Sequence, residues 1–170
     1  MSGEAHLTCL DATFYRMKFA RDAAAVLQAA SAPEGRFHYD GQSALYLSAT
    51  ADGTVVATRR YMTADDPERQ IFPLRVVSNR IVDLRDPVAT RHFDIDVTDR
   101  PVEWQAWRQK GLRAPTWVIS DRVRSLGLHG MLYMSRSDPT LTHLTLFAWN
   151  TPEGASVSIA EPPMNWPATV

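Results

Sequence analysis

P-E-G-R-F-H-Y-D-G-Q-S-A-L-Y-L-S-A-T-A-D-G-T-V-V-A-T-R-R, residues 33–60, is the stretch that most strongly indicates the fold. It begins with a Gly-Arg-aromatic triplet, residues 35–37, in a short polar turn. An apolar strand is predicted over residues 44–48, and a helix is predicted over residues 52–62 with Asp52 as its cap. A strand end beside a helix start can hold a phosphate group, and arginine offers that group a fixed, charged fork.

The segments on either side predict a mixture of strands and short helices. The alternation over residues 10–17 indicates a strand that ends near Arg16, and the alanine-rich residues 20–30 indicate a helix. Residues 88–100 are predicted to be irregular. Further strands are predicted over residues 71–77, 80–84, 130–135 and 142–150, the first two separated by a turn at Ser78-Asn79, and further helices over residues 102–110 and 115–126.

The order of these elements favours one domain. A chain of 170 residues is ordinarily served by a single core, and neither a repeat nor a long linker divides it. We therefore expect a single domain over residues 1–170, with its core at about 13–150 and a C-terminal extension at 151–170 that adds an edge strand at 156–160. Because strands and helices alternate irregularly, the predicted class is α+β: a single compact domain with a mixed, twisted β-sheet core and flanking helices.

Composition excludes several classes of partner. The formal net charge is -1, so no strong field attracts the molecule to nucleic acid or to an anionic membrane. No apolar run approaches the roughly 20 residues that cross a bilayer, and residues 1–7 do not resemble a secretory signal. Cys9 is the only cysteine, so no intrachain disulfide can form. We expect a cytoplasmic, soluble chain that binds neither nucleic acid nor membrane directly.

Common catalytic and metal-binding motifs are absent from the sequence. The five histidines form neither an H-x-x-x-H nor an H-E-x-x-H pair, so no metal site is predicted. A P-loop, a G-x-G-x-x-G fingerprint and a G-x-S-x-G elbow are also missing.

What remains is a set of polar residues at predicted strand ends. Each has an ordinary structural interpretation, as a surface ion-pair partner, a helix cap, a core residue with its hydroxyl at the edge, or the start of a turn. As a set they indicate a ligand site, and they are Arg16, Arg36, His38, Tyr39, Tyr46 and Ser135.

The motifs that carry these residues, in their order, resemble those of the RES-domain family, which is named for its Arg, Glu and Ser. The resemblance covers about residues 13–150. It is carried by the Tyr-Arg pair that ends the first strand, the Gly-Arg-aromatic turn, the strand A-L-Y-L-S, the stretch A-P-T-W-V-I-S-D-R-V-R-S-L-G-L-H-G-M-L-Y-M-S-R-S, and the closing T-H-L-T-L-F-A-W-N.

The resemblance implies an ADP-ribosyltransferase-like fold and the toxin of a bacterial toxin–antitoxin pair. It implies NAD as the substrate, cleaved by hydrolysis or phosphorolysis or used to transfer ADP-ribose to a protein acceptor, without a metal. The implied partner is an antitoxin with an Xre-like DNA-binding domain.

The resemblance also implies residue roles. Arg16 and Arg36 would bind the NAD phosphates or ribose, and Tyr46 would form the nicotinamide pocket. Ser135 would hydrogen-bond the nicotinamide or its ribose, and His38 and Tyr39 would line the same turn.

The sequence departs from the family at the expected glutamate, where Thr58 stands. A threonine carries no charge to offset a cationic transition state. Three outcomes follow: a slow or altered NAD-consuming enzyme, another acid such as Asp40 or Asp83 in the role, or a non-catalytic module that binds nucleotide or antitoxin. An interaction domain without any ligand is a further alternative.

Overall fold

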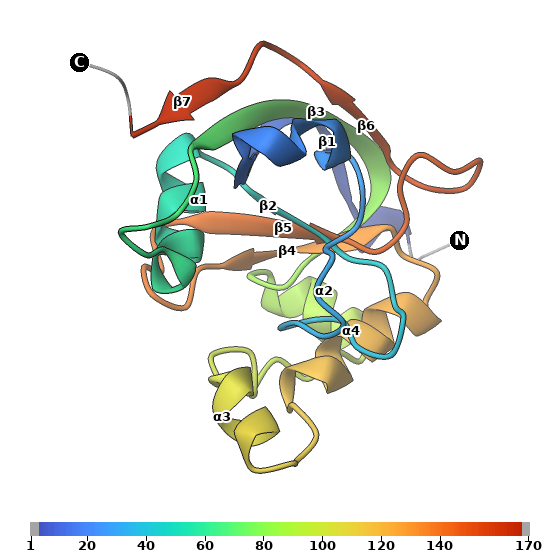
Figure 1. The fold of residues 1–170 in the computed structure, drawn as a ribbon. Helices are drawn as coiled ribbons and strands as arrows, with labels where there is room; N and C mark the ends of the chain where they lie inside the picture. The colour runs from blue at the N-terminus through green and yellow to red at the C-terminus, as the bar shows by residue number, and fades with distance from the viewer. Residues whose placement is uncertain (1–3, 168–170) are drawn as a thin grey trace.

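Five strands of the computed structural model, which describes residues 4–167, join into a bent, closed ring (Figure 1). Their hydrogen-bonded order is β1-β2-β5-β4-β3, and β3 pairs again with β1 to close the ring. Only the β3–β4 pair is parallel among the pairings of the described strands. The strands are β1 Thr8–Phe19, β2 Leu45–Ser48, β3 Arg69–Asp83, β4 Gly130–Met134, β5 Thr142–Leu146, β6 Ser156–Ile159 and β7 Met164–Trp166.

Short helices flank the ring at one side and one end. Figure 1 shows α2 and α4 beneath β4, α3 farther out, and α1 beside the ends of β2 and β5. The helices are α1 Ala51–Thr58, α2 Pro87–His92, α3 Trp104–Gln109 and α4 Thr116–Ser125, with 3-10 turns η1 Glu4–His6, η2 Ala20–Ala25 and η3 Arg59–Tyr61. This mixed sheet with flanking helices confirms the predicted α+β class. Across residues 4–167, no helix has the length and apolar character that a membrane crossing requires.

Two apolar clusters hold the elements together. One joins strands around the ring, with Leu45, Leu74 and Leu144 fully buried. The other joins β4 to the helices beneath it, with Ile119 and Met131 almost fully buried. Each such side chain contributes about 1.5–3 kcal/mol when it leaves water. The second cluster therefore fixes α4 against the sheet.

The prediction of a turn at Ser78-Asn79 is wrong, because β3 continues through both residues without a break. The pairing with β1 instead shifts register there: Leu10 faces Ser78, whereas Thr8 faces Ile81. One extra residue on β3 is thus accommodated as a bulge, which bends the strand without ending it. Ser78 is buried and its hydroxyl lies 2.9 Å from Nδ1 of His129, so a tertiary contact stabilises the bulge.

The helix predicted over residues 20–30 is shorter than expected. Only Ala20–Ala25 form a turn of 3-10 helix. The carbonyls of Val26 and Gln28 instead accept hydrogen bonds from Arg16, and the amide of Ala30 donates to Ala44. Local alanine propensity is overridden by these long-range partners.

Two helix starts also differ from the prediction. The cap of α1 is Thr50, whose hydroxyl accepts from the Gly53 amide at 3.0 Å, while Asp52 lies in the first turn. The irregular segment predicted over 88–100 contains α2, which is capped by Asp86 and has Pro87 in its first turn. An aspartate before a proline is a known helix-start signal, so the sequence contained this information.

The described part of the C-terminal extension, residues 151–167, contains two strands. The predicted edge strand is present as β6, and β7 follows it; both pair antiparallel with β3. Figure 1 shows this segment running above the long strand β3, at the top of the view. The extension therefore protects an edge of β3 that would otherwise expose unpaired backbone groups.

Gly130, the first residue of β4, has no room for a side chain. A Cβ there would collide with the carbonyl oxygen of Thr145 and would lie 3.0 Å from Cα of Leu146. We expect Gly130→Ala to lower the free energy of unfolding by about 1–3 kcal/mol, measured by denaturant unfolding, because the β4–β5 backbone must shift. Gly41→Ala is the control: its Cβ would meet nothing within 4 Å, and only the strain of a φ of +78° remains. Equal losses in both variants would contradict the steric explanation.

Candidate active site

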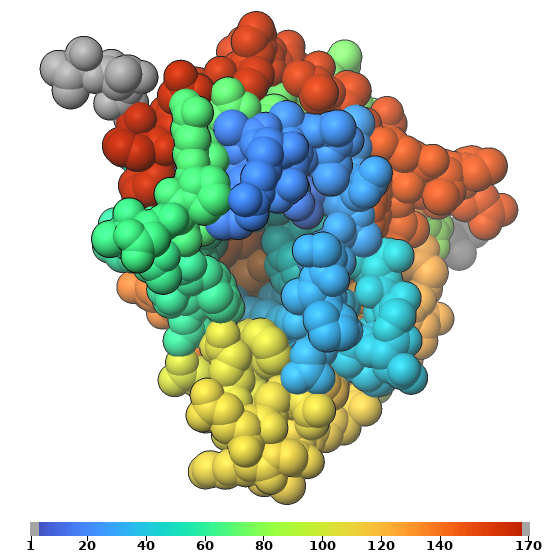
Figure 2. All heavy atoms as spheres, in the orientation of Figure 1, coloured from blue at the N-terminus to red at the C-terminus, as the bar shows by residue number. Residues whose placement is uncertain are grey.

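A cavity of about 230 Å³ opens where the end of β1 meets β2 and α1. Figure 2 shows the hollow, bordered by the blue N-terminal segment, the green segment around α1 and the yellow segment around α3. Its lining is rich in hydroxyl and cationic groups and comprises Tyr15, Arg16, Met17, Lys18, Tyr46, Leu47, Ser48, Thr54, Thr58, Tyr133 and His143. Of the residues predicted for the site, the structure thus brings Arg16, Tyr46 and Thr58 together around one cavity.

Arg16 is buried in this lining, on the same face of β1 as the core residue Phe14. Its Nη1 donates to the carbonyl oxygens of Val26 and Gln28, at 2.5 and 2.7 Å. Burial lowers the pKa of Arg16 to about 10, so the guanidinium remains cationic at neutral pH. Arg16 therefore both shapes the segment after η2 and brings a positive charge to the cavity.

Lys18 adds a second cation to the same side of the cavity. Burial, followed by the nearby charge of Arg16, lowers the pKa of Lys18, and Asp22 acts in the opposite direction. No aspartate or glutamate belongs to the lining among residues 4–167. The cavity is therefore electropositive and suited to an anionic ligand.

Tyr46 lines the cavity and its hydroxyl contacts the Gly-Arg-aromatic turn. Its hydroxyl lies 2.7 Å from Nδ1 of His38 and accepts from the Phe37 amide at 3.0 Å. Because Nε2 of His38 lies 2.9 Å from the carbonyl oxygen of Ala32, that nitrogen must carry a proton, and a neutral His38 then accepts at Nδ1 from Tyr46. Burial raises the pKa of Tyr46, so the phenol stays protonated and can donate.

His38 is therefore buried behind Tyr46, outside the cavity lining. We expect Tyr46→Phe to lower the free energy of unfolding by about 1–3 kcal/mol, because the Phe37 amide and the His38 ring lose their partner. Thermal or denaturant unfolding measures this loss. The control is Tyr15→Phe, which removes the hydroxyl of another tyrosine in the lining. If Tyr15→Phe lowers the free energy of unfolding as much as Tyr46→Phe does, the Tyr46 hydroxyl has no specific role.

Arg36 lies beside the cavity and is not one of its lining residues. Its guanidinium stands over the rings of Phe37 and Tyr133, at 4.9 and 5.3 Å, and its Nη2 donates to the carbonyl of Arg100 at 2.5 Å. The Nε of Arg36 is buried without a partner among the described residues. Its charge nevertheless acts on the cavity, because it helps to lower the pKa of His143 in the lining.

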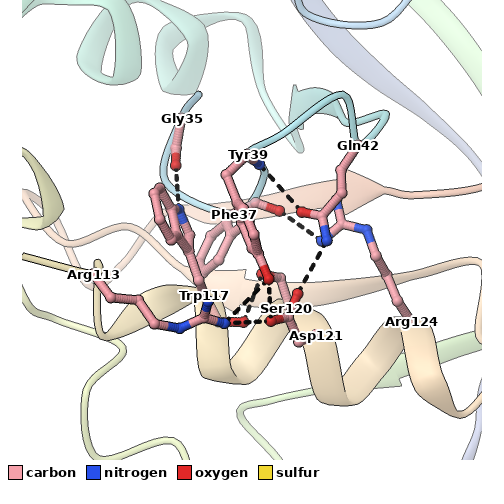
Figure 3. Close-up of polar contacts among 9 residues, drawn as sticks. All are labelled: Gly35, Phe37, Tyr39, Gln42, Arg113, Trp117, Ser120, Asp121 and Arg124. Atoms are coloured by element: carbon pink, nitrogen blue, oxygen red, sulfur yellow. Dashed lines mark hydrogen bonds and ion pairs between the residues drawn. The ribbon is translucent and has the colours of Figure 1, made fainter. Parts of the chain in front are cut away.

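The turn around Arg36 is fastened to α4 (Figure 3). Trp117 donates from its indole to the carbonyl of Gly35 at 2.8 Å, and Tyr39 stacks on the Trp117 ring with centroids 4.4 Å apart. The hydroxyl of Tyr39 donates to Asp121 at 2.8 Å, and Arg113 donates to the same carboxylate. Tyr39 is thus held against α4, away from the cavity lining, and serves to position the turn.

The other predicted residues lie at different places. Ser135 is buried at the end of β4, where its hydroxyl accepts from the Asp138 amide at 3.3 Å, and it is not part of the cavity lining. Asp83 pairs with Arg85, and Asp40 is exposed in the turn near α4. Neither carboxylate lines the cavity, so the geometry offers no acid in place of the one expected at Thr58.

Sequence reasoning missed five polar residues of the lining: Lys18, Ser48, Thr54, Tyr133 and His143. Thr54 precedes Thr58 by one helical turn, so the spacing alone placed both on one face of α1. His143 and Ser48 are direct neighbours across the β2–β5 ladder, and Tyr133 faces His143 across β4–β5. Those neighbours could be found only after the strand order was known.

Comparisons with known proteins found a matching family model and a similar solved structure. The family model described as RES domain matches residues 13–169. The chain also resembles a protein in the crystal structure of the MbcT–MbcA toxin–antitoxin complex of M. tuberculosis, with a TM-score of 0.65 and 16% identity, over 97% of this chain and 92% of that one. Among curated proteins, the sequence comparison found no match.

Proposed function

This chain belongs to the RES domain family, and on that premise we propose that it is a bacterial toxin that consumes NAD. The observation that carries the proposal is the electropositive, hydroxyl-lined cavity that contains Arg16, Tyr46 and Thr58. The similar fold in the MbcT–MbcA toxin–antitoxin complex supports it.

The chemistry of NAD suits the groups present. Cleavage of the bond between nicotinamide and ribose produces a cationic, oxocarbenium-like ribose, and an enzyme assists by holding the pyrophosphate and orienting the nicotinamide. The charges of Arg16 and Lys18 are available to the phosphates, and the rings of Tyr46 and Tyr133 to the nicotinamide. Arg36, whose guanidinium lies over the ring of Tyr133, adds its positive charge from outside the lining.

The size of the cavity sets how NAD would lie. A volume of about 230 Å³ is below the roughly 300–1,000 Å³ of pockets that enclose a drug-sized ligand. The cavity would therefore enclose one end of the dinucleotide, the nicotinamide and its ribose. The adenosine end would lie along the open hollow seen in Figure 2.

Incubation of the purified chain with NAD tests the proposal. We expect free nicotinamide, and mass analysis of the other products then identifies the acceptor: ADP-ribose for water, ADP-ribose phosphate for inorganic phosphate, or a modified protein. Expression without a partner is expected to stop bacterial growth. No nicotinamide release, no protein modification and normal growth together would refute the proposed activity.

A second candidate function is a non-catalytic module that binds nucleotide or antitoxin. It is favoured by one observation, which is that no carboxylate lines the cavity among the described residues. Calorimetric titration with NAD separates the two functions. Heat of binding without nicotinamide release supports the module, whereas release supports the enzyme.

The proposed partner is a cognate antitoxin with an Xre-like DNA-binding domain. The similar solved structure is a toxin–antitoxin complex. A partner of this kind would cover the open cavity and block ligand binding there. Co-expression with an Xre-like protein encoded beside this chain is expected to restore growth and to yield a complex on gel filtration. Growth arrest that persists with a co-expressed, folded partner would contradict the pairing.

A further inference from the structure

The cavity contains a buried serine–histidine pair that the proposed roles leave unused. Ser48 and His143 are direct neighbours on β2 and β5, and the serine hydroxyl lies 2.8 Å from Nδ1 of His143. Both side chains line the cavity, and they are 3% and 6% exposed. A histidine with one nitrogen held by a hydrogen bond has a fixed ring orientation, which suits a group that must meet a ligand.

The second nitrogen of His143 is available to a ligand. Its Nδ1 makes the hydrogen bond to Ser48, whereas Nε2 makes no hydrogen bond within residues 4–167 and is not fully buried. Burial, assisted by the charge of Arg36, lowers the pKa of His143 to about 4, so the ring is neutral at pH 7. A neutral imidazole can exchange a hydrogen bond with a hydroxyl group in either tautomer, because a hydroxyl both donates and accepts.

We propose that His143, oriented by Ser48, contacts a ribose hydroxyl of the ligand through Nε2. The inference deepens the proposed function and rests on it. Such a contact would hold the ribose by a hydrogen bond alone, because the neutral imidazole carries no charge. His143 reaches the cavity from β5, flanked by Ser48 on β2 and Tyr133 on β4. It therefore stands on the rigid floor of the site rather than on a loop.

The chain supplies a matched control in a second buried serine–histidine pair. Ser78 Oγ lies 2.9 Å from Nδ1 of His129, and His129 is 7% exposed. His129 is not part of the cavity lining. The two pairs share the serine contact at Nδ1 and the low exposure of both side chains, and they differ in whether the ring meets the cavity. His129 is in addition hydrogen-bonded to the backbone of Glu153. A role in folding alone would be shared by both histidines, whereas a role in ligand binding belongs to His143.

Two substitutions separate the nitrogens of His143. Glutamine places an amide near the position of Nε2, and asparagine places one near Nδ1. If Nε2 contacts the ligand, we expect His143→Asn to lower kcat/KM for nicotinamide release by about 10- to 100-fold, the usual effect of one lost hydrogen bond in a buried site. His143→Gln is expected to retain most of the activity. His129→Asn is expected to reduce thermal stability and to leave kcat/KM within about twofold.

A readout independent of turnover completes the test. We expect ADP-ribose, added to the intact chain, to shift the imidazole NMR signals of His143 and to leave those of His129 in place. Unshifted His143 signals at saturating ADP-ribose overturn the inference, as does an active chain in which His143→Asn cleaves NAD normally. If His143 shifts while no nicotinamide is released, the ribose contact stands and the proposed NAD-consuming activity fails.

Discussion

Replacing Arg16 with alanine is expected to reduce NAD cleavage by about 10²-fold or more and to lower the free energy of unfolding by about 2–4 kcal/mol. The guanidinium supplies charge to the cavity, and its Nη1 also holds the carbonyls of Val26 and Gln28. Val26 is 2% exposed, so its carbonyl would be left without a partner in an apolar region. Nicotinamide release measures the first effect, and denaturant unfolding measures the second.

Two further variants separate the roles of Arg16. Lys18→Met removes a cavity charge from the same strand and is expected to raise KM for NAD with little change in stability, since the Lys18 side chain makes no hydrogen bond to the described residues. Arg75→Ala removes an exposed arginine of β3 that pairs with Asp11; surface pairs of this kind contribute about 0–1 kcal/mol. An Arg16→Ala chain with unchanged stability and turnover would show that neither role exists.

Replacing Thr58 with glutamate is expected to raise the rate of NAD cleavage by about 10²- to 10³-fold, the usual worth of one preorganised electrostatic contact. Thr58 lines the cavity one helical turn after Thr54, and no aspartate or glutamate lines it among residues 4–167. A carboxylate there would face the developing cation on the ribose. The initial rate of nicotinamide release at saturating NAD measures the effect.

Matched variants test whether charge and position are both needed. Thr58→Gln has the size of glutamate without its charge and is expected to leave the rate near that of the natural chain. Ala57→Glu adds the same charge to the exposed neighbouring position of α1, which is not part of the lining. A rate unchanged in a folded Thr58→Glu chain would mean that Thr58 does not occupy the position of the family glutamate.

Strand periodicity and helix signals in the sequence were enough to predict the α+β class. The strands of the quoted motifs and the late edge strand β6 follow from local patterns. These patterns succeed because alternation and capping act over a few residues. The errors occur where distant groups decide: Ser78 with His129 makes a bulge where a turn was expected, and Arg16 shortens the helix after β1.

The sequence by itself determined the family, the presence of Arg16, Tyr46 and Thr58 in its motifs, and the missing carboxylate. Only the tertiary structure decided which side chains share the cavity. It removed Tyr39 and Ser135 from the lining, set Arg36 behind Tyr133, and brought in His143, which is 95 residues from Ser48 in the chain. The physical reason is that the role of a polar side chain depends on the side chains next to it. On a sheet those neighbours belong to the paired strands, so strand pairing rather than local sequence determines them.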